Sequence, residues 1–147
     1  MKKFLAILLC LMIFLSVSCF AADREVTVLI DGETLVTDTP PQLISGRTML
    51  PMRAIFEAFD ANVTWMGEDE LIFATKGDML VVLKIGAKEM SVQRASEDMG
   101  EIVTLDVAPF LYNERTMVPA RAIAEALGAD VDWIDQTSTV VIKSQNK

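Results

Sequence analysis

The sequence contains no histidine, and its two cysteines, Cys10 and Cys19, both lie close to the amino terminus. Histidine is the commonest general base and the commonest transition-metal ligand, so its absence excludes the catalytic and metal sites that depend on it. Basic residues are also scarce, with 13 against 21 acidic residues and a net charge of −8. That balance argues against nucleic acid or an anionic membrane as a partner.

Residues 1–21 are predicted to be a secretory signal peptide. Lys2 and Lys3 form a charged start, residues 4–15 are an unbroken apolar run, and small residues lead up to Ala21. This order of charged, apolar and small residues is typical of export signals. We therefore expect a secreted or cell-surface protein.

Cleavage after Ala21 fits best, because Cys19 and Ala21 then occupy the two positions that must be small. The mature chain, residues 22–147, would lose two lysines and carry a net charge of −10. It would also lack cysteine, which excludes disulfides, thiolate metal sites and cysteine nucleophiles. Two alternatives place the protein at a membrane: an uncleaved anchor over residues 4–20, or lipidation of Cys19. The apolar stretch is at the short end of the ~17–25 residues that a span needs.

The strongest pattern is internal self-similarity. Residues 47–65 (RTMLPMRAIFEAFDANVTW) and 115–133 (RTMVPARAIAEALGADVDW) are identical at 12 of 19 positions, at an offset of 68. Average composition predicts about one match. The full copies are predicted at about 26–76 and 88–143. Each copy is too small to bury its apolar face alone, so we expect one domain over residues 22–147.

Each copy is predicted to contain one helix of about nine residues, starting at Pro51 or Pro119 as the first helical residue. Apolar residues at helical spacing form one buried face in each helix, comprising Ile55, Phe56 and Phe59, and then Ile123, Ala124 and Leu127. Gly128 suits a left-handed cap at the helix end, whereas Asp60 takes this place in the first copy with less ease.

Strands are predicted on both sides of each helix. Asp31-Gly32 between apolar runs indicates a tight hairpin, and the second copy has a longer polar loop there, Arg94–Gly100. Further strands are expected at 63–65, 71–75, 79–85, 88–92, 131–133 and 139–143. The predicted fold class is α+β, an antiparallel sheet packed with two short helices and related by an internal pseudo-twofold repeat.

The motif G-R-T-x-x-P-x-R-A-I followed by E-A-x-x-A-x-V-x-W resembles the copper amine oxidase N-terminal-like domain family. Gly46–Arg53 carries it in the first copy and Glu114–Arg121 in the second, over a resemblance that spans about residues 25–143. The resemblance implies a stalk-type α/β domain of exported bacterial proteins, found beside enzymatic or cell-wall modules. In the oxidases, the copper ligands are histidines and the quinone cofactor derives from tyrosine, both in another domain. The resemblance therefore implies no oxidase activity and no cofactor.

The residues shared by both copies are interpreted as a structural motif, because residues that determine the fold must recur. They are Arg47, Thr48, Pro51, Arg53, Glu57 and Trp65, and Arg115, Thr116, Pro119, Arg121, Glu125 and Trp133. The arginines could form an anion site. The preferred interpretation is i,i+4 pairs of Arg53 with Glu57 and of Arg121 with Glu125. Arg47 and Arg115 are expected to bond loop carbonyls or Asp38 and Asp106. The tryptophans could form a carbohydrate or peptide platform, but core packing is preferred.

No catalytic, cofactor-binding or metal-binding residues are predicted. The sequence favours an exported, non-catalytic binding or scaffold domain of the bacterial cell envelope or extracellular space, acting through a protein or cell-wall partner. The alternative is a small-ligand or metal-binding exported protein, with Met49, Met52 and the Glu68–Glu70 turn as candidate ligands. A carboxylate-based hydrolase is a third possibility, but no pair of acids stands out by spacing.

Overall fold

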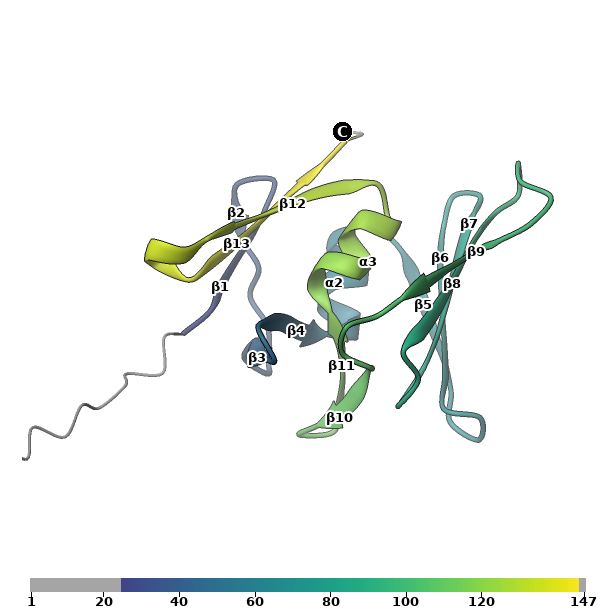
Figure 1. The fold of residues 1–147 in the computed structure, drawn as a ribbon, viewed down its shortest axis with the longest axis horizontal. Helices are drawn as coiled ribbons and strands as arrows, with labels where there is room; N and C mark the ends of the chain where they lie inside the picture. Colours follow the sequence, from purple (N-terminus) through teal and green to yellow (C-terminus); the bar gives the residue numbers. More distant parts are fainter. Residues whose placement is uncertain (1–24, 146–147) are drawn as a thin grey trace, which may run out of the picture.

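The computed structural model describes residues 25–145. Two short helices, α2 (Met52–Ala58) and α3 (Ala120–Ala126), lie together at the centre, and three β-sheets surround them (Figure 1). The predicted α+β class is confirmed, because the strands are mostly antiparallel and the described helices are short. The described strands form three sheets, a number that the prediction of antiparallel sheet did not specify. The signal-peptide prediction falls on residues outside the described part.

The sheet below the helices in Figure 1, here called the β4 sheet, joins the two halves of the chain. Its order is β10 (Phe110–Tyr112), β11 (Arg115–Pro119), β4 (Arg47–Pro51) and β3 (Gln42–Ile44). The middle strands β4 and β11 are antiparallel, and Leu50 lies opposite Val118. These two residues are 68 positions apart, the offset of the sequence repeat.

The β1 sheet, on the left in Figure 1, contains strands from both ends of the described chain. Its order is β12 (Ala129–Ile134), β13 (Thr139–Ser144), β1 (Thr27–Ile30) and β2 (Glu33–Thr34). β1 and β2 form the predicted Asp31-Gly32 hairpin, with positive φ at both turn residues. β1 pairs in parallel with β13, so this sheet forms only when both halves meet.

The β7 sheet, on the right in Figure 1, is fully antiparallel. Its order is β5 (Asn62–Met66), β6 (Leu71–Lys76), β7 (Met79–Lys84), β8 (Glu89–Arg94) and β9 (Glu101–Thr104). The predicted bridging strand is β7, which lies between β6 of the first half and β8 of the second. In the β1 sheet the corresponding strands, β13 and β1, pair directly. Each outer sheet therefore combines strands of both halves.

The helices start one residue later than predicted. Pro51 and Pro119 are the last residues of β4 and β11, with extended ψ angles of 122° and 115°. Their positions in the strand ladder, opposite Met117 and Met49, hold the prolines outside the helix. Each helix therefore has seven residues instead of about nine.

Both helices end in the left-handed geometry that was predicted. Asp60 has a φ of 56° and Gly128 a φ of 81°. The backbone N–H of Asp60 donates to Glu57 at 2.9 Å, and that of Gly128 to Glu125 at 3.0 Å. The left-handed conformation carries no steric cost for Gly128, whereas it strains Asp60 because that residue has a Cβ atom.

The predicted helix faces form the core. Ile55, Phe56, Ile123 and Ala124 are completely buried, and Phe59 and Leu127 nearly so. They belong to one apolar cluster together with residues of the surrounding sheets, including Leu50 and Val118 of the β4 sheet. Burial of such side chains contributes about 1.5–3 kcal/mol each, so the helices hold the three sheets together.

The predicted core packing of the tryptophans is wrong. Trp65 is 42% exposed and Trp133 is 39% exposed. Both lie near the ends of β5 and β12, which are edge strands of their sheets. There the indoles have no neighbouring strand on one side. The Trp133 Nε1 donates to Asp135 Oδ1 at 3.4 Å, which connects the polar edge of the ring to the following turn.

Candidate functional site

Two grooves flank the helices, and their linings correspond position by position. The α3 groove has a volume of about 680 Å³ and the α2 groove about 550 Å³. The α2 groove is lined by residues within 35–38, 51–58 and 114–116. The residues 68 positions away from these all line the α3 groove, within 103–106, 119–126 and 46–48. Each groove therefore combines the helix of one half with a strand start from the other.

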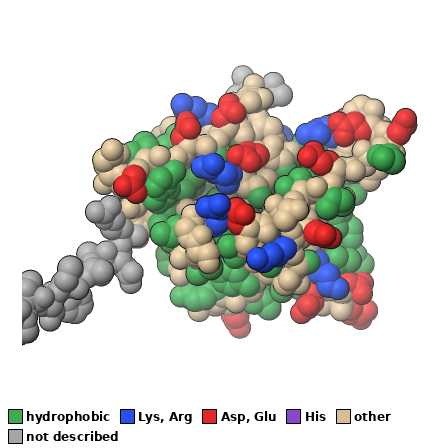
Figure 2. Space-filling view, in the orientation of Figure 1, with side chains coloured by type: hydrophobic (Ala, Val, Ile, Leu, Met, Phe, Trp, Pro, Cys, Tyr) green, Lys and Arg blue, Asp and Glu red, His purple; other side chains and the backbone are tan. Residues whose placement is uncertain are grey.

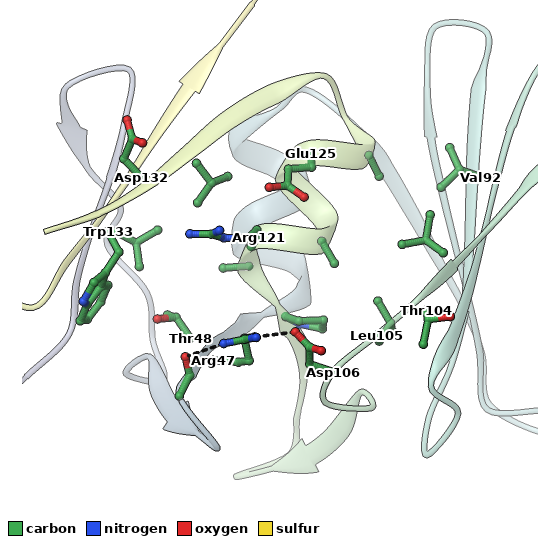
Figure 3. Close-up of a pocket in the computed structure, with 18 of the residues that line it drawn as sticks. Arg47, Thr48, Val92, Thr104, Leu105, Asp106, Arg121, Glu125, Asp132 and Trp133 are labelled. Atoms are coloured by element: carbon green, nitrogen blue, oxygen red, sulfur yellow. Dashed lines mark hydrogen bonds and ion pairs between the residues drawn. The ribbon is translucent and has the colours of Figure 1, made fainter. Parts of the chain in front are cut away.

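An ion pair between the halves borders the α3 groove. The Arg47 Nε donates to Asp106 Oδ2 at 2.5 Å, and its Nη1 donates to the Gly46 carbonyl at 3.4 Å (Figure 3). Both kinds of partner weighed from the sequence are thus present. The arginine bonds the aspartate of the other half, a pairing that the repeat alone did not specify.

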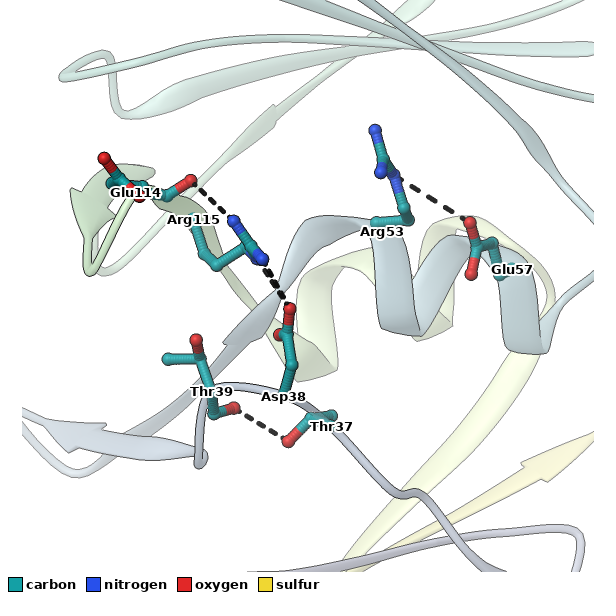
Figure 4. Close-up of polar contacts among 7 residues, drawn as sticks. All are labelled: Thr37, Asp38, Thr39, Arg53, Glu57, Glu114 and Arg115. Atoms are coloured by element: carbon teal, nitrogen blue, oxygen red, sulfur yellow. Dashed lines mark hydrogen bonds and ion pairs between the residues drawn. The ribbon is translucent and has the colours of Figure 1, made fainter.

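The equivalent ion pair borders the α2 groove. Arg115 Nη2 lies 2.7 Å from Asp38 Oδ2, and its Nη1 donates to the Glu114 carbonyl at 3.3 Å (Figure 4). The hydrogen bond from Arg115 lowers the pKa of the Asp38 carboxyl below its ordinary value of 3.8. The same contact raises the pKa of the Arg115 guanidinium. Both side chains are about half exposed, so solvent screens the interaction.

The helix pairs differ between the grooves. Arg53 Nε lies 3.9 Å from Glu57 Oε1 in α2, as predicted. The predicted pair of Arg121 with Glu125 in α3 is wrong, because no ion pair joins them among the described residues. Figure 3 shows Arg121 pointing across the groove, away from Glu125 and toward the β12 side. Within residues 25–145, Arg121 has no hydrogen-bond or ion-pair partner.

The α3 groove is extended by strands that the α2 groove lacks. β12 contributes Val131, Asp132 and Trp133 on one side, and β8 and β9 contribute Val92 and Glu101 on the other. Among residues 25–145, no aromatic side chain lines the α2 groove. Sequence reasoning missed this difference, because it placed Trp133 in the core.

The α3 groove contains more carboxylates than free cations. Of its arginines, Arg47 pairs with Asp106 and Arg94 pairs with Glu97. Glu101, Glu125 and Asp132 have no ion-pair partner in the described part of the chain. Figure 2 shows basic and acidic side chains side by side on this face. The groove thus offers one free cation, several carboxylate acceptors, an aromatic ring and apolar walls.

The candidate metal ligands are not arranged as a site. Met49 is completely buried and Met52 is 9% exposed, which is typical of methionines that fill a core. The Glu68–Glu70 turn is exposed and separate from both grooves. No group of three or more His, Cys, Asp or Glu side chains in residues 25–145 could hold a metal ion. No helix in this range is long and apolar enough to cross a membrane.

The fold is that of a small α+β domain with a groove beside each helix. The family model of the copper amine oxidase N-terminal domain matches residues 29–142, which is most of the chain. The chain belongs to the copper amine oxidase N-terminal domain family. The model matches once, over both halves together, and domains of this family are typically non-catalytic accessory domains. A search of curated proteins finds no match.

Proposed function

We propose that this protein is an exported, non-catalytic binding module that acts through a partner in the cell envelope or outside the cell. The observation that carries this proposal is the α3 groove, where an unpaired Arg121 and a half-exposed Trp133 occur together. Arginine and tryptophan are the residue types that most often dominate binding energy at protein surfaces.

We also propose that the two halves are copies of one unit related by a pseudo-twofold axis between Leu50 and Val118. The antiparallel register of β4 and β11 around these residues supports it. The equivalent linings of the two grooves and the reciprocal ion pairs support it further. Residues kept in both copies then hold the fold, and a partner is recognised where the copies differ.

The non-catalytic role is supported by the residue types that line the α3 groove. Among the described residues, the lining has no histidine, cysteine or serine, so its candidate bases and nucleophiles are carboxylates and the hydroxyls of Thr48 and Thr104. Export is supported by the predicted signal peptide at residues 1–21. Amino-terminal sequencing of protein secreted from the full chain should begin at Ala22, and an unprocessed amino terminus would overturn export by cleavage.

A retention assay tests the binding function. The processed protein is incubated at micromolar concentration with purified bacterial cell walls and, separately, with immobilised proteins of the culture medium. We expect at least one of the two materials to retain the protein. The Arg121→Ala variant should lose this retention, whereas the matched control Arg53→Ala should keep it. Arg53 occupies the same helix position but forms an ion pair with Glu57. If neither material retains the unmodified protein, the proposed function is wrong.

A further inference from the structure

We infer that the α3 groove binds a neutral glycan, an inference that rests on the proposed binding function. Trp133 packs against the apolar face of a sugar ring, while Arg121 and Glu125 bond hydroxyl groups of the glycan.

The charge of the groove selects against an anionic ligand. Arg121 is its unpaired cation among the described residues, whereas Glu101, Glu125 and Asp132 are carboxylates without an ion-pair partner. The whole chain, including the groove, has a net charge of −8. An anionic polymer would therefore meet repulsion from the groove and from the protein around it. A cationic ligand would meet Arg121, which Figure 3 shows near the middle of the groove.

A neutral ligand rich in hydroxyl groups matches the remaining chemistry. A hydroxyl both donates and accepts hydrogen bonds. It can accept from the Arg121 guanidinium and donate to the Glu125 carboxylate. Hydrogen bonds to ionised groups are about twice as strong as neutral ones. A glycan can therefore bond both side chains without adding a charge.

Trp133 supplies the apolar part of the site. Its indole is 39% exposed at the edge of the groove, and Figure 3 shows it pointing away from the side chain of Asp132, as adjacent residues of a strand do. The hydrogen bond from Nε1 to Asp135 Oδ1, at 3.4 Å, occupies the polar edge of the ring and limits its rotation. The apolar face of a ring held in this way is available for packing against C–H groups.

The shape of the groove suits a chain of sugar rings. It lies in front of α3, between β12 on one side and β8 and β9 on the other (Figure 3). Its volume of about 680 Å³ is within the ~300–1,000 Å³ of small-molecule sites. The α2 groove has neither the tryptophan nor an unpaired helix arginine, so it serves as an internal comparison.

Calorimetry with defined oligosaccharides tests this inference. The probes are cellohexaose and the hexamer of N-acetylglucosamine, both neutral, with polygalacturonate as the anionic comparison. We expect the processed protein to bind at least one neutral probe. Trp133→Ala and Arg121→Ala should each weaken this binding about tenfold or more, as truncation of a tryptophan or arginine that dominates binding energy does. Trp65→Ala and Arg53→Ala, the equivalent changes in the other half, should leave it within about twofold.

Circular dichroism and thermal unfolding show whether each variant is folded, so a loss of binding can be assigned to the groove. The inference is overturned if neither neutral hexamer binds at millimolar concentration, if polygalacturonate binds more tightly, or if the Trp133 and Arg121 variants bind normally. Retention on cell walls or medium proteins without binding of either hexamer would overturn the glycan inference alone. Absence of retention on either material would overturn the proposed function itself.

Discussion

Arg115 and Asp38 form a hydrogen-bonded ion pair between residues 77 positions apart. Both the Nε and the Nη2 of Arg115 reach Asp38 Oδ2, at 2.8 and 2.7 Å. The contact joins the start of β11 to the segment before β3, beside the α2 groove. Because the pair lowers the pKa of Asp38, it couples the contact between the halves to pH.

We predict that Asp38→Asn reduces the loss of stability in acid. A carboxyl whose pKa is lower in the folded state stabilises the fold above its unfolded pKa. That contribution is lost as the pH falls below 3.8 toward the folded pKa. Denaturant midpoints measured from neutral pH to below pH 3.8 should therefore fall less steeply for Asp38→Asn than for the unmodified protein. The effect should be small, since both side chains are exposed.

Asp69→Asn is the control for this experiment, because Asp69 lies in an exposed turn and forms no ion pair among the described residues. Equal acid dependence of Asp38→Asn and the unmodified protein would contradict the predicted coupling.

The left-handed helix ends predict opposite effects for two exchanges. Asp60→Gly should stabilise the protein by up to about 1 kcal/mol, because a φ of 56° strains a residue with a side chain. Gly128→Ala should destabilise it by about 1 kcal/mol. A Cβ on Gly128 would meet nothing within 4 Å, so the cost is conformational and not steric. Urea unfolding measures both, and stabilisation by Gly128→Ala would refute this reading of the helix end.

Phe56 and Ala124 occupy equivalent helix positions, and both are completely buried. Phe56→Ala should destabilise the protein by about 3–5 kcal/mol, because it leaves a cavity between α2 and the sheets. Ala124→Phe should destabilise it by about 1–3 kcal/mol through overpacking. Chemical denaturation measures both values. A near-neutral Ala124→Phe would mean that the core around α3 has unfilled space.

The exposed tryptophans predict small costs for conservative replacement. Trp65→Phe and Trp133→Phe should each change the free energy of unfolding by less than about 1 kcal/mol, because surface substitutions away from special features are mild. Acrylamide should quench the fluorescence of both indoles efficiently in the folded protein, in agreement with exposed fractions near 40%. A destabilisation of several kcal/mol by either change would restore the core interpretation.

The local elements of this fold could be predicted from the sequence, because their signals are short-range. The Asp31-Gly32 hairpin, the helix faces around Ile55 and Ile123, and the left-handed Gly128 each depend on a few adjacent residues. The distribution of strands among three sheets could not be predicted. Apolar alternation tells which face of a strand is buried, but it does not tell which strand lies beside it.

The candidate site could be predicted only in part. The sequence identified Arg121 and Trp133, but it assigned both to structural roles because each recurs in the other half. The same residue at equivalent positions of the two halves does not have to play the same role in both. The surroundings of Arg53 and Arg121 differ. Glu57 lies 3.9 Å from Arg53, while Arg121 points toward β12 without a partner in the described chain. This difference between the two arginines depends on the sheet that each helix packs against, β5 for α2 and β12 for α3. A short-range sequence pattern does not indicate which sheet that is.

The parallel pairing of β1 with β13 has a mechanical consequence. Thr27 lies beside Thr139 and Ile30 beside Ile142, so the first residue of β1 and the last of β13 are at opposite ends of the pair. Tension between these two points slides the strands along each other instead of peeling them apart. The hydrogen bonds of the pair would then bear such a load together instead of one after another.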